Sequence, residues 1–185
     1  MAWIKVIEEN EGNSELNKVY QRIKNERGKL SNIMKVHSLK PGAMQAHLDL
    51  YQSIMFNESS LRRELKEMIA VVVSQLNGCQ YCVQHHSEAL MHYWKNREKT
   101  EGFQEDFESV NLSHQQKNIL QFAKKLTREP QSMEEKDVQA LKELGLNDQE
   151  ILEIALIVSY FNFVNRTANG LGVNLTENEI KGYKH

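Results

Sequence analysis

The sequence predicts an all-α protein, a single helical bundle of about seven to eight helices that spans residues 1–185. Apolar residues recur at intervals of three and four along almost every segment, which is the period of an amphipathic helix, and strict alternation is nearly absent. Glycine and proline together make up 11 of the 185 residues, below the average usage of about 12%. A many-stranded sandwich, which needs many turns, is therefore disfavoured, and the length is that of about one domain.

The first half of the chain predicts five helices, over residues 15–27, 33–39, 41–56, 61–76 and about 79–96. Pro41 suits the first turn of the third helix, where a backbone N–H has no partner in any case. The buried stripe of this helix is expected at Ala43, Ala46, Leu50 and Ile54. The Asn-Gly pair at residues 77–78 breaks the chain between the fourth and fifth helices.

The second half begins with a charged stretch, residues 95–108, which is expected to be a solvated connection with about one helical turn. Three later helices are expected to open with capping boxes, in which a side chain and the backbone satisfy each other's unpaired groups. The pairs are Ser113 with Gln116, Ser132 with Glu135, and Asn147 with Glu150. The last helix, about residues 147–169, is the most apolar, and Gly170 is expected to end it in a left-handed conformation.

Composition limits the functional classes. The formal net charge of −2 is too close to neutral for sequence-independent binding to a phosphate backbone, so nucleic acid is not expected as a partner. The chain begins without a signal peptide, and no apolar run approaches the roughly 20 residues that cross a bilayer, so we expect a cytoplasmic protein without membrane contact. The only cysteines are Cys79 and Cys82. In a reducing compartment, such a pair indicates redox or metal chemistry.

Reactive side chains cluster in one segment, residues 77–86. At 100° per residue, Cys79, Cys82 and His86 fall within a 60° sector of one helix, so they are expected to be neighbours. A cysteine in the first turn of a helix, and in a Cys-x-x-Cys pair, has a lowered pKa. His86 can exchange a proton near neutral pH, whereas His85 points about 100° away and is the weaker candidate.

A carboxylate would complete a proton relay, and Glu67 lies on the preceding helix, twelve residues before Cys79. Antiparallel packing of the two helices would bring it alongside the pair. Burial there is expected to raise the pKa of Glu67 toward the range of a general base. Glu64 and Glu88 compete with it on sequence alone.

The run from Lys66 to His86 resembles the active-site signature of the alkylhydroperoxidase D-like (AhpD) group, within the carboxymuconolactone decarboxylase superfamily. The run from Tyr160 to Gly172 resembles the closing helix and turn of a subgroup of uncharacterised peroxidase-related proteins. The resemblance implies an all-α fold, homo-oligomers and peroxide reduction by a dithiol. It departs at Tyr81, because the best-known pattern has a histidine before the second cysteine.

Residue by residue, the resemblance implies that Cys82 attacks the peroxide, that Cys79 resolves the product, and that Glu67 and His86 relay protons. The implied partners are a hydroperoxide substrate and an electron donor, either a dithiol or a disulfide reductase. No cofactor and no metal are implied.

Other readings of the same residues stay open. Cys79, Cys82 and His86 supply three ligands, whereas a structural zinc normally has four. The thiols could also be spectators, or a redox sensor without turnover, and a decarboxylase-like activity rests on fold kinship alone. Asn165 and Arg166 either line a pocket, contact a partner subunit or, for Arg166, complement the helix dipole. The remaining candidates are assigned no role or a place in the core or a subunit interface: His37, His47, His92, His114, Tyr160, Phe161 and Phe163.

Overall fold

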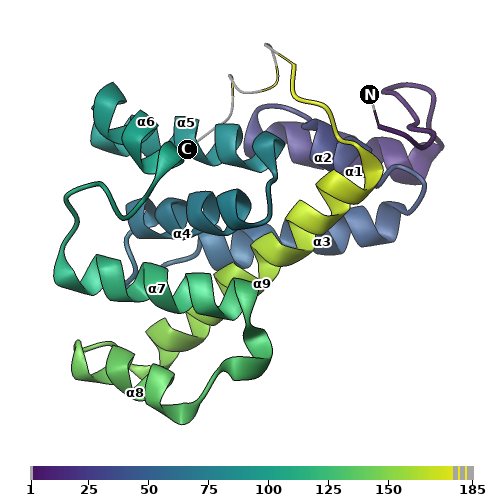
Figure 1. The fold of residues 1–185 in the computed structure, drawn as a ribbon. Coiled ribbons are helices and arrows are strands. Elements are labelled where there is room, and N and C mark those ends of the chain that lie inside the picture. Colours follow the sequence, from purple (N-terminus) through teal and green to yellow (C-terminus); the bar gives the residue numbers. More distant parts are fainter. Residues whose placement is uncertain (1, 177–178, 180–181, 183–185) are drawn as a thin grey trace.

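The computed structural model describes residues 2–176, 179 and 182, and every regular element within them is a helix (Figure 1). The α-helices of this described part are α1 (Ser14–Arg27), α2 (Asn32–Lys35), α3 (Pro41–Met55), α4 (Arg63–Leu76), α5 (Gln80–Trp94), α6 (Arg97–Glu105), α7 (His114–Arg128), α8 (Glu135–Glu143) and α9 (Asp148–Leu171). A short 3-10 turn, Pro130–Ser132, joins α7 to α8. The predicted all-α helical bundle is confirmed.

Helix α4 lies at the centre of the bundle and packs against α5, α7 and α9 (Figure 1). Its residues from Met68 to Val73 are completely buried. Because neighbours cover it on several sides, this helix needs apolar residues around most of its circumference rather than along one stripe. The result is a rigid central element that ends directly before the cysteine pair.

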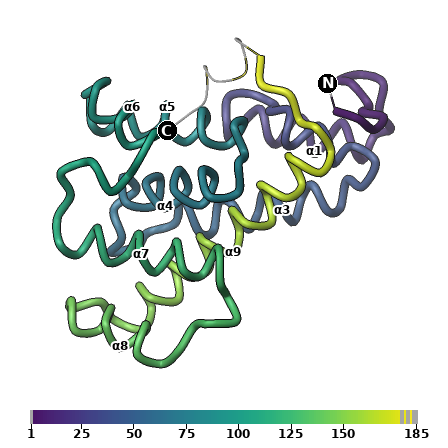
Figure 2. The backbone as a smooth tube through the Cα atoms, in the orientation of Figure 1, coloured from purple at the N-terminus to yellow at the C-terminus, as the bar shows by residue number. Residues whose placement is uncertain are grey.

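A second, smaller hydrophobic cluster joins α1, α2 and α3, and it includes Leu16, Ile23, Met34 and Leu48. Figure 2 shows that α9 runs diagonally through the fold, from α8 at one end toward α1 and α3 at the other. The molecule therefore has two apolar clusters, and α9 borders both.

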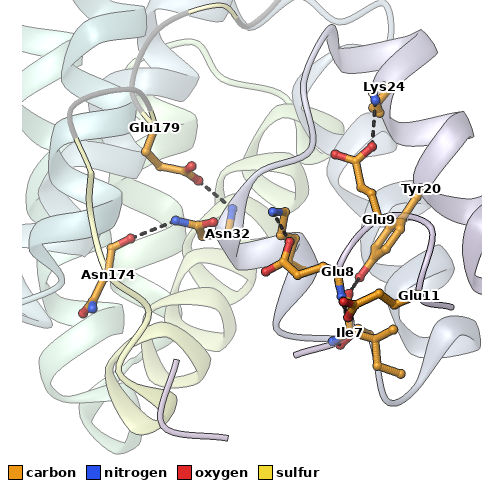
Figure 3. A network of polar contacts seen from close by, with 11 residues as sticks. Ile7, Glu8, Glu9, Glu11, Tyr20, Lys24, Asn32, Asn174 and Glu179 are labelled. Atoms are coloured by element: carbon orange, nitrogen blue, oxygen red, sulfur yellow. Dashed lines mark hydrogen bonds and ion pairs between the residues drawn. The ribbon is translucent and has the colours of Figure 1, made fainter. Parts of the chain in front are cut away.

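Polar contacts hold the segments near both ends of the chain against the helices (Figure 3). The Tyr20 hydroxyl donates to the Ile7 carbonyl oxygen at 2.5 Å. The backbone N–H of Asn32 donates to the Glu179 carboxylate at 2.6 Å, and its side-chain amide donates to the Asn174 carbonyl oxygen at 3.1 Å. These bonds place the chain after α9 beside α2.

The prediction for residues 95–108 was wrong, because nine of these residues form α6. The Asn96 side chain caps the helix by accepting from the Lys99 N–H at 3.0 Å. Thr100 and Phe103, three residues apart, are buried, and the Phe103 ring packs edge-on to Trp94 with centroids 5.2 Å apart. Two inward-facing positions are enough to dock a helix whose other positions are mostly charged.

The predicted stripe of α3 was also wrong at three of its four positions, because the buried face is shifted around the helix. Ile54 is buried as predicted, whereas Ala43, Ala46 and Leu50 are exposed. The residues that actually face inward are Met44, His47, Leu48, Ile54 and Met55. Alanine occurs on either face of a helix, and a histidine does not usually mark a core position. The sequence pattern of α3 therefore favours the wrong face as the buried one.

Capping boxes form as predicted at Ser113 and at Asn147, but not at Ser132. Ser132 lies in the 3-10 turn, and Glu134 caps α8 in a box with Asp137 instead. The described part of the chain contains no helix with both the length and the apolar character needed to cross a bilayer.

The end of α9 also differs from the prediction, since Gly170 is helical and the left-handed residue is Gly172, at φ 61°. We therefore expect Gly172→Ala to lower the free energy of unfolding by at least about 1–2 kcal/mol, the cost of a left-handed conformation in a residue with a Cβ. Displacement of the Trp3 ring, with which the new Cβ would clash, adds to this cost. Gly170→Ala is the matched control and should raise it by up to about 1 kcal/mol, because its Cβ meets open space in a helix. Urea unfolding of both variants checks the pair, and destabilisation by Gly170→Ala alone would contradict it.

Candidate active site

A pocket lies where the two hydrophobic clusters meet, with a cavity of about 100 Å³. Ile23, Met34 and Leu48 from the smaller cluster line one side, and Phe161 and Val164 from the larger one line another. The residues that line the pocket and carry titratable or nucleophilic groups include Glu67, Tyr81, Cys82, His86, His47 and Tyr160. A cavity of this size accepts a small organic molecule rather than a large cofactor.

The turn between α4 and α5 brings the two cysteines together. Asn77 ends α4, and Gly78 takes φ 64°, a left-handed conformation that favours glycine. Cys79 is the residue that caps α5, and Cys82 lies in its first turn. Their sulfurs are 2.9 Å apart, and both side chains are buried. The predicted neighbourhood of the two sulfurs is confirmed, although Cys79 precedes the helix, and only Cys82 lines the pocket.

The two thiols titrate as a pair. The hydrogen bond between the two sulfurs lowers the pKa of Cys79, because a proton kept on one sulfur stabilises a thiolate on the other. The same bond, together with burial, raises the pKa of Cys82 well above its usual range. The amide of Asn165 hydrogen-bonds both sulfurs and favours the thiolate form. The pair therefore loses its first proton readily and holds its second firmly.

Glu67 is completely buried on α4 and joins two cationic or protonatable side chains. Its Oε2 accepts a hydrogen bond from His86 Nδ1 at 2.6 Å. Its Oε1 accepts from Arg63, with Nη2 at 2.6 Å and Nε at 2.7 Å. Because Nδ1 of His86 donates to the carboxylate, Nε2 is the nitrogen left to act as a base. The structure thus brings Glu67 and His86 together at the wall that Cys82 also lines.

The predicted direction of the Glu67 pKa shift was wrong. Burial alone would raise this pKa, but the charges of His86 and Arg63 and their hydrogen bonds outweigh burial and lower it to about 2. Glu67 is therefore a permanent carboxylate that orients and stabilises His86, not a general base. Arg63 lies four residues before Glu67 on one helix, a spacing that pairs opposite charges, and this signal was available in the sequence.

The lowered pKa of Glu67 predicts a specific loss of stability in acid. Its contribution is complete above the ordinary pKa of 4.5 and disappears as the pH falls through about 2, and it amounts to about 3 kcal/mol. The difference in free energy of unfolding between wild type and Glu67→Gln should therefore narrow by about that amount between pH 6 and pH 2. Urea titrations across this range check it, and a constant difference would show that Glu67 keeps its ordinary pKa in the fold.

The competing residues lie elsewhere or have other partners. Glu64 accepts a hydrogen bond from the Trp94 indole, and Glu88 is exposed. His85 does line the pocket, but burial and the nearby charge of His86 lower its pKa to about 3, so it is neutral near pH 7. Tyr81 is buried and donates to Glu179 at 2.6 Å rather than to a cysteine.

Asn165 is a site residue, because its buried amide lies beside both sulfurs and donates to Ser74 at 3.1 Å. Arg166 is exposed and bonds to Asn162 of its own helix, away from the pocket. His47, to which the sequence assigned no role, lines the pocket and meets Tyr160. These two residues are 113 positions apart, so no local pattern could have linked them.

The zinc alternative would need a fourth ligand beside Cys79, Cys82 and His86. Within the described residues, no group of three or more His, Cys, Asp or Glu side chains is arranged to hold a metal ion. His86 Nδ1, one of its two ring nitrogens, is occupied by Glu67.

Comparison with known proteins agrees with this geometry. Residues 41–101, from α3 into α6, match the Carboxymuconolactone decarboxylase family, and this range contains Glu67, Cys79, Cys82 and His86. A peroxidase-related protein of uncharacterised function from Silicibacter sp. TM1040 is 27% identical, with a TM-score of 0.87 over 97% of this chain and 94% of that one. Residues 41–101 therefore carry the pattern of the Carboxymuconolactone decarboxylase family, and the chain as a whole shares its fold with a peroxidase-related protein.

Two further structures share the fold of this chain. A peroxidase-related protein with an alkylhydroperoxidase AhpD core, from Ralstonia eutropha JMP134, is 24% identical, with a TM-score of 0.87 over 97% of this chain and 94% of that one. The debrominase Bmp8, solved with 2,3,4-tribromopyrrole, is 20% identical, with a TM-score of 0.78 over 98% of this chain and all of that one. One AhpD-like fold therefore occurs among proteins described by different chemistries.

Proposed function

We propose that this protein is a thiol-dependent peroxidase that reduces a small hydroperoxide through Cys79 and Cys82. The observation that carries the proposal is the pair of sulfurs 2.9 Å apart, one of them at the wall of a pocket that His86 and Glu67 also line. A thiolate is the nucleophile in such chemistry, and a second thiol in contact with it provides rapid disulfide closure.

The reaction balances with groups that the pocket contains and two external reactants. The Cys82 thiolate attacks the terminal oxygen of the hydroperoxide, the O–O bond breaks, and the alkoxide leaves with one proton as an alcohol. Cys82 is now a sulfenic acid, and the Cys79 sulfur displaces its oxygen as water to form the disulfide. An external dithiol then reduces the disulfide and is itself oxidised.

The Glu67–His86 pair fits the role of proton carrier in this cycle. The Glu67 carboxylate holds the His86 ring through Nδ1, which leaves Nε2 to take the thiol proton and return it to the leaving oxygen. A neighbouring carboxylate also stabilises the imidazolium that forms in between. Arg63 keeps the carboxylate charged throughout.

Cys82 is assigned as the attacking sulfur because it lines the pocket, whereas Cys79 lies behind it. The pKa values favour the first thiolate on Cys79. A proton held between sulfurs 2.9 Å apart needs little movement to change sides. Attack from Cys82 therefore follows transfer of the shared proton to Cys79 or to His86.

The second candidate is reductive debromination of a small aromatic ring. It is favoured by the aromatic lining of the pocket, which includes Tyr51, Tyr81, Tyr160 and Phe161, and by the likeness of the fold to that of Bmp8. In this reaction the pair would reduce a carbon–bromine bond to a carbon–hydrogen bond, release bromide, and become the disulfide. The same external dithiol would restore it.

Stopped-flow mixing of the reduced protein with tert-butyl hydroperoxide tests the first proposal. We expect the Cys79–Cys82 disulfide to form and, with excess dithiothreitol, many equivalents of peroxide to be consumed per protein. A single oxidation without turnover would instead indicate a redox sensor. Bromide release from 2,3,4-tribromopyrrole without oxidation by the hydroperoxide would favour the second candidate, and a pair that stays reduced in both reactions would contradict both.

A further inference from the structure

His47 and Tyr160 form a buried polar pair in the same pocket, outside the proposed proton relay. His47 comes from α3 and Tyr160 from α9, and the distance from His47 Nε2 to the Tyr160 hydroxyl oxygen is 2.6 Å. Their exposed fractions are 5% and 6%. His47 Nδ1 has no hydrogen-bond partner within the described part of the chain. A buried polar pair with unused hydrogen-bonding capacity calls for an explanation.

Both side chains are neutral near pH 7. Burial, with a smaller effect from His37, lowers the pKa of His47 to about 3, so its ring carries a single N–H. Burial raises the pKa of Tyr160 well above its usual range, so its hydroxyl keeps its hydrogen. The pair therefore holds two polar hydrogens and uses one of them in the bond between its members.

The position of the second hydrogen follows from the cost of burial. If Tyr160 donated to His47, the remaining N–H would lie on Nδ1, buried without an acceptor, and buried N–H groups are rarely left unpaired. With the hydrogen on Nε2, His47 donates to Tyr160, and the donor without an acceptor in the protein is instead the Tyr160 O–H, which lies at the cavity, where a ligand can accept from it. We assign this second tautomer. The Tyr160 O–H is then available, since its hydrogen-bond contacts within the described residues are with His47.

The residues that line the cavity beside Tyr160 indicate what kind of ligand its O–H would contact. Tyr160 and Cys82 line the same cavity, and Tyr160 is near enough for the charge on Cys82 to affect its pKa. Leu48, Phe161 and Val164 add apolar surface to the wall, which also contains charged residues such as Arg27 and Arg63. A ligand held between Tyr160, Cys82 and these apolar side chains would contact a hydroxyl donor, a sulfur and an apolar surface.

We propose that Tyr160 donates a hydrogen bond to the oxygen of the substrate that becomes the leaving alkoxide, and that His47 positions Tyr160. This inference rests on the proposed peroxidase function. As Cys82 breaks the O–O bond, negative charge develops on the leaving oxygen, where a positioned donor stabilises it.

Binding of two inert probes tests the inference without any peroxide. Benzyl alcohol and toluene differ by one hydroxyl, and NMR titration of the reduced protein gives a dissociation constant for each. We expect Tyr160→Phe to weaken benzyl alcohol binding about fivefold, the effect of one neutral hydrogen bond, and to leave toluene binding within about twofold. Equal weakening of both probes, unchanged binding of both, or no binding of benzyl alcohol to wild type would each overturn the inference.

Two further variants separate positioning from general damage to the pocket. Tyr93→Phe is the matched control, because it removes the same hydroxyl group from a tyrosine that does not line the pocket. It should leave the affinities for both probes within about twofold. His47→Leu should weaken benzyl alcohol binding selectively, and His47→Gln should recover part of that loss, since its amide N–H can still donate to Tyr160. If His47→Gln recovered none of the benzyl alcohol affinity, or if His47→Leu weakened toluene binding equally, His47 would not be a positioning residue.

The two proposals can fail separately. If wild-type cysteines stay reduced in hydroperoxide but the benzyl alcohol preference depends on Tyr160, the subsite stands and the peroxidase function falls. If the cysteines are oxidised but binding does not depend on Tyr160, the function stands and the subsite falls.

Discussion

Replacing Cys82 with serine should abolish reduction of the hydroperoxide, with a loss of rate of about 1,000-fold or more, as expected when a nucleophile is removed. The serine hydroxyl stays largely un-ionised near neutral pH, and Cys79, the remaining thiol, does not line the pocket. Peroxide consumption in the presence of dithiothreitol measures this effect. Fold stability should change little, because serine is close in size to cysteine.

The matched variant Cys79→Ser should still react with the hydroperoxide but should stop at the oxidised form of Cys82. Cys82 would still attack, but no second thiol would close the disulfide, so its sulfenic acid should persist and be trapped by dimedone, as seen by mass spectrometry. Because the chain has only two cysteines, each variant leaves a single assignable thiol. A trapped adduct in Cys82→Ser and not in Cys79→Ser would reverse the two roles. Absence of an adduct from both would contradict thiol chemistry altogether.

Glu67→Gln should lower the free energy of unfolding by about 3–5 kcal/mol, the usual cost of removing one partner from a buried ion pair. The amide cannot balance the Arg63 guanidinium, whose side chain is 15% exposed, and it cannot stabilise a charged His86. We also expect peroxide reduction to slow by about 100-fold, within the usual contribution of acid–base catalysis. Urea unfolding and peroxide consumption, measured where the variant is folded, give the two effects.

Two controls make the Glu67 result specific. Glu64→Gln lies on the same helix and keeps an oxygen that can accept from Trp94, so it should change stability by less than about 1 kcal/mol. Glu67→Asp keeps the charge and should recover part of both losses. If Glu64→Gln and Glu67→Gln proved equally damaging, the effect would belong to α4 in general and not to the Arg63–Glu67–His86 contacts.

The fold class and most helix positions follow from the sequence, because they depend on local spacing. The boundaries of α4 and α5 follow from apolar periodicity and the turn at Gly78. The errors lie where local patterns are ambiguous. Helix α6 needs only Thr100 and Phe103 to dock, and a stretch of charged residues concealed that spacing.

In the candidate site too, local spacing predicts some features, and others depend on the three-dimensional structure. Cys79, Cys82 and His86 are close in sequence, so helical geometry alone predicts that they are neighbours. The direction of the Glu67 pKa shift depends on a balance between burial and two nearby charges, and that balance requires positions in space. The sequence suggested a buried carboxylate, and the structure supplied the partners that keep it charged.

By itself, the sequence determined the helical bundle, the cysteine pair at the start of a helix and the candidates proposed to relay protons. Only the tertiary structure decided that Glu67 stays ionised and that α3 and α9 bring His47 to Tyr160 across 113 residues. The physical reason is range: helix periodicity and turns act over a few residues, whereas desolvation and the pairing of buried polar groups depend on whichever distant segments the packed core places side by side.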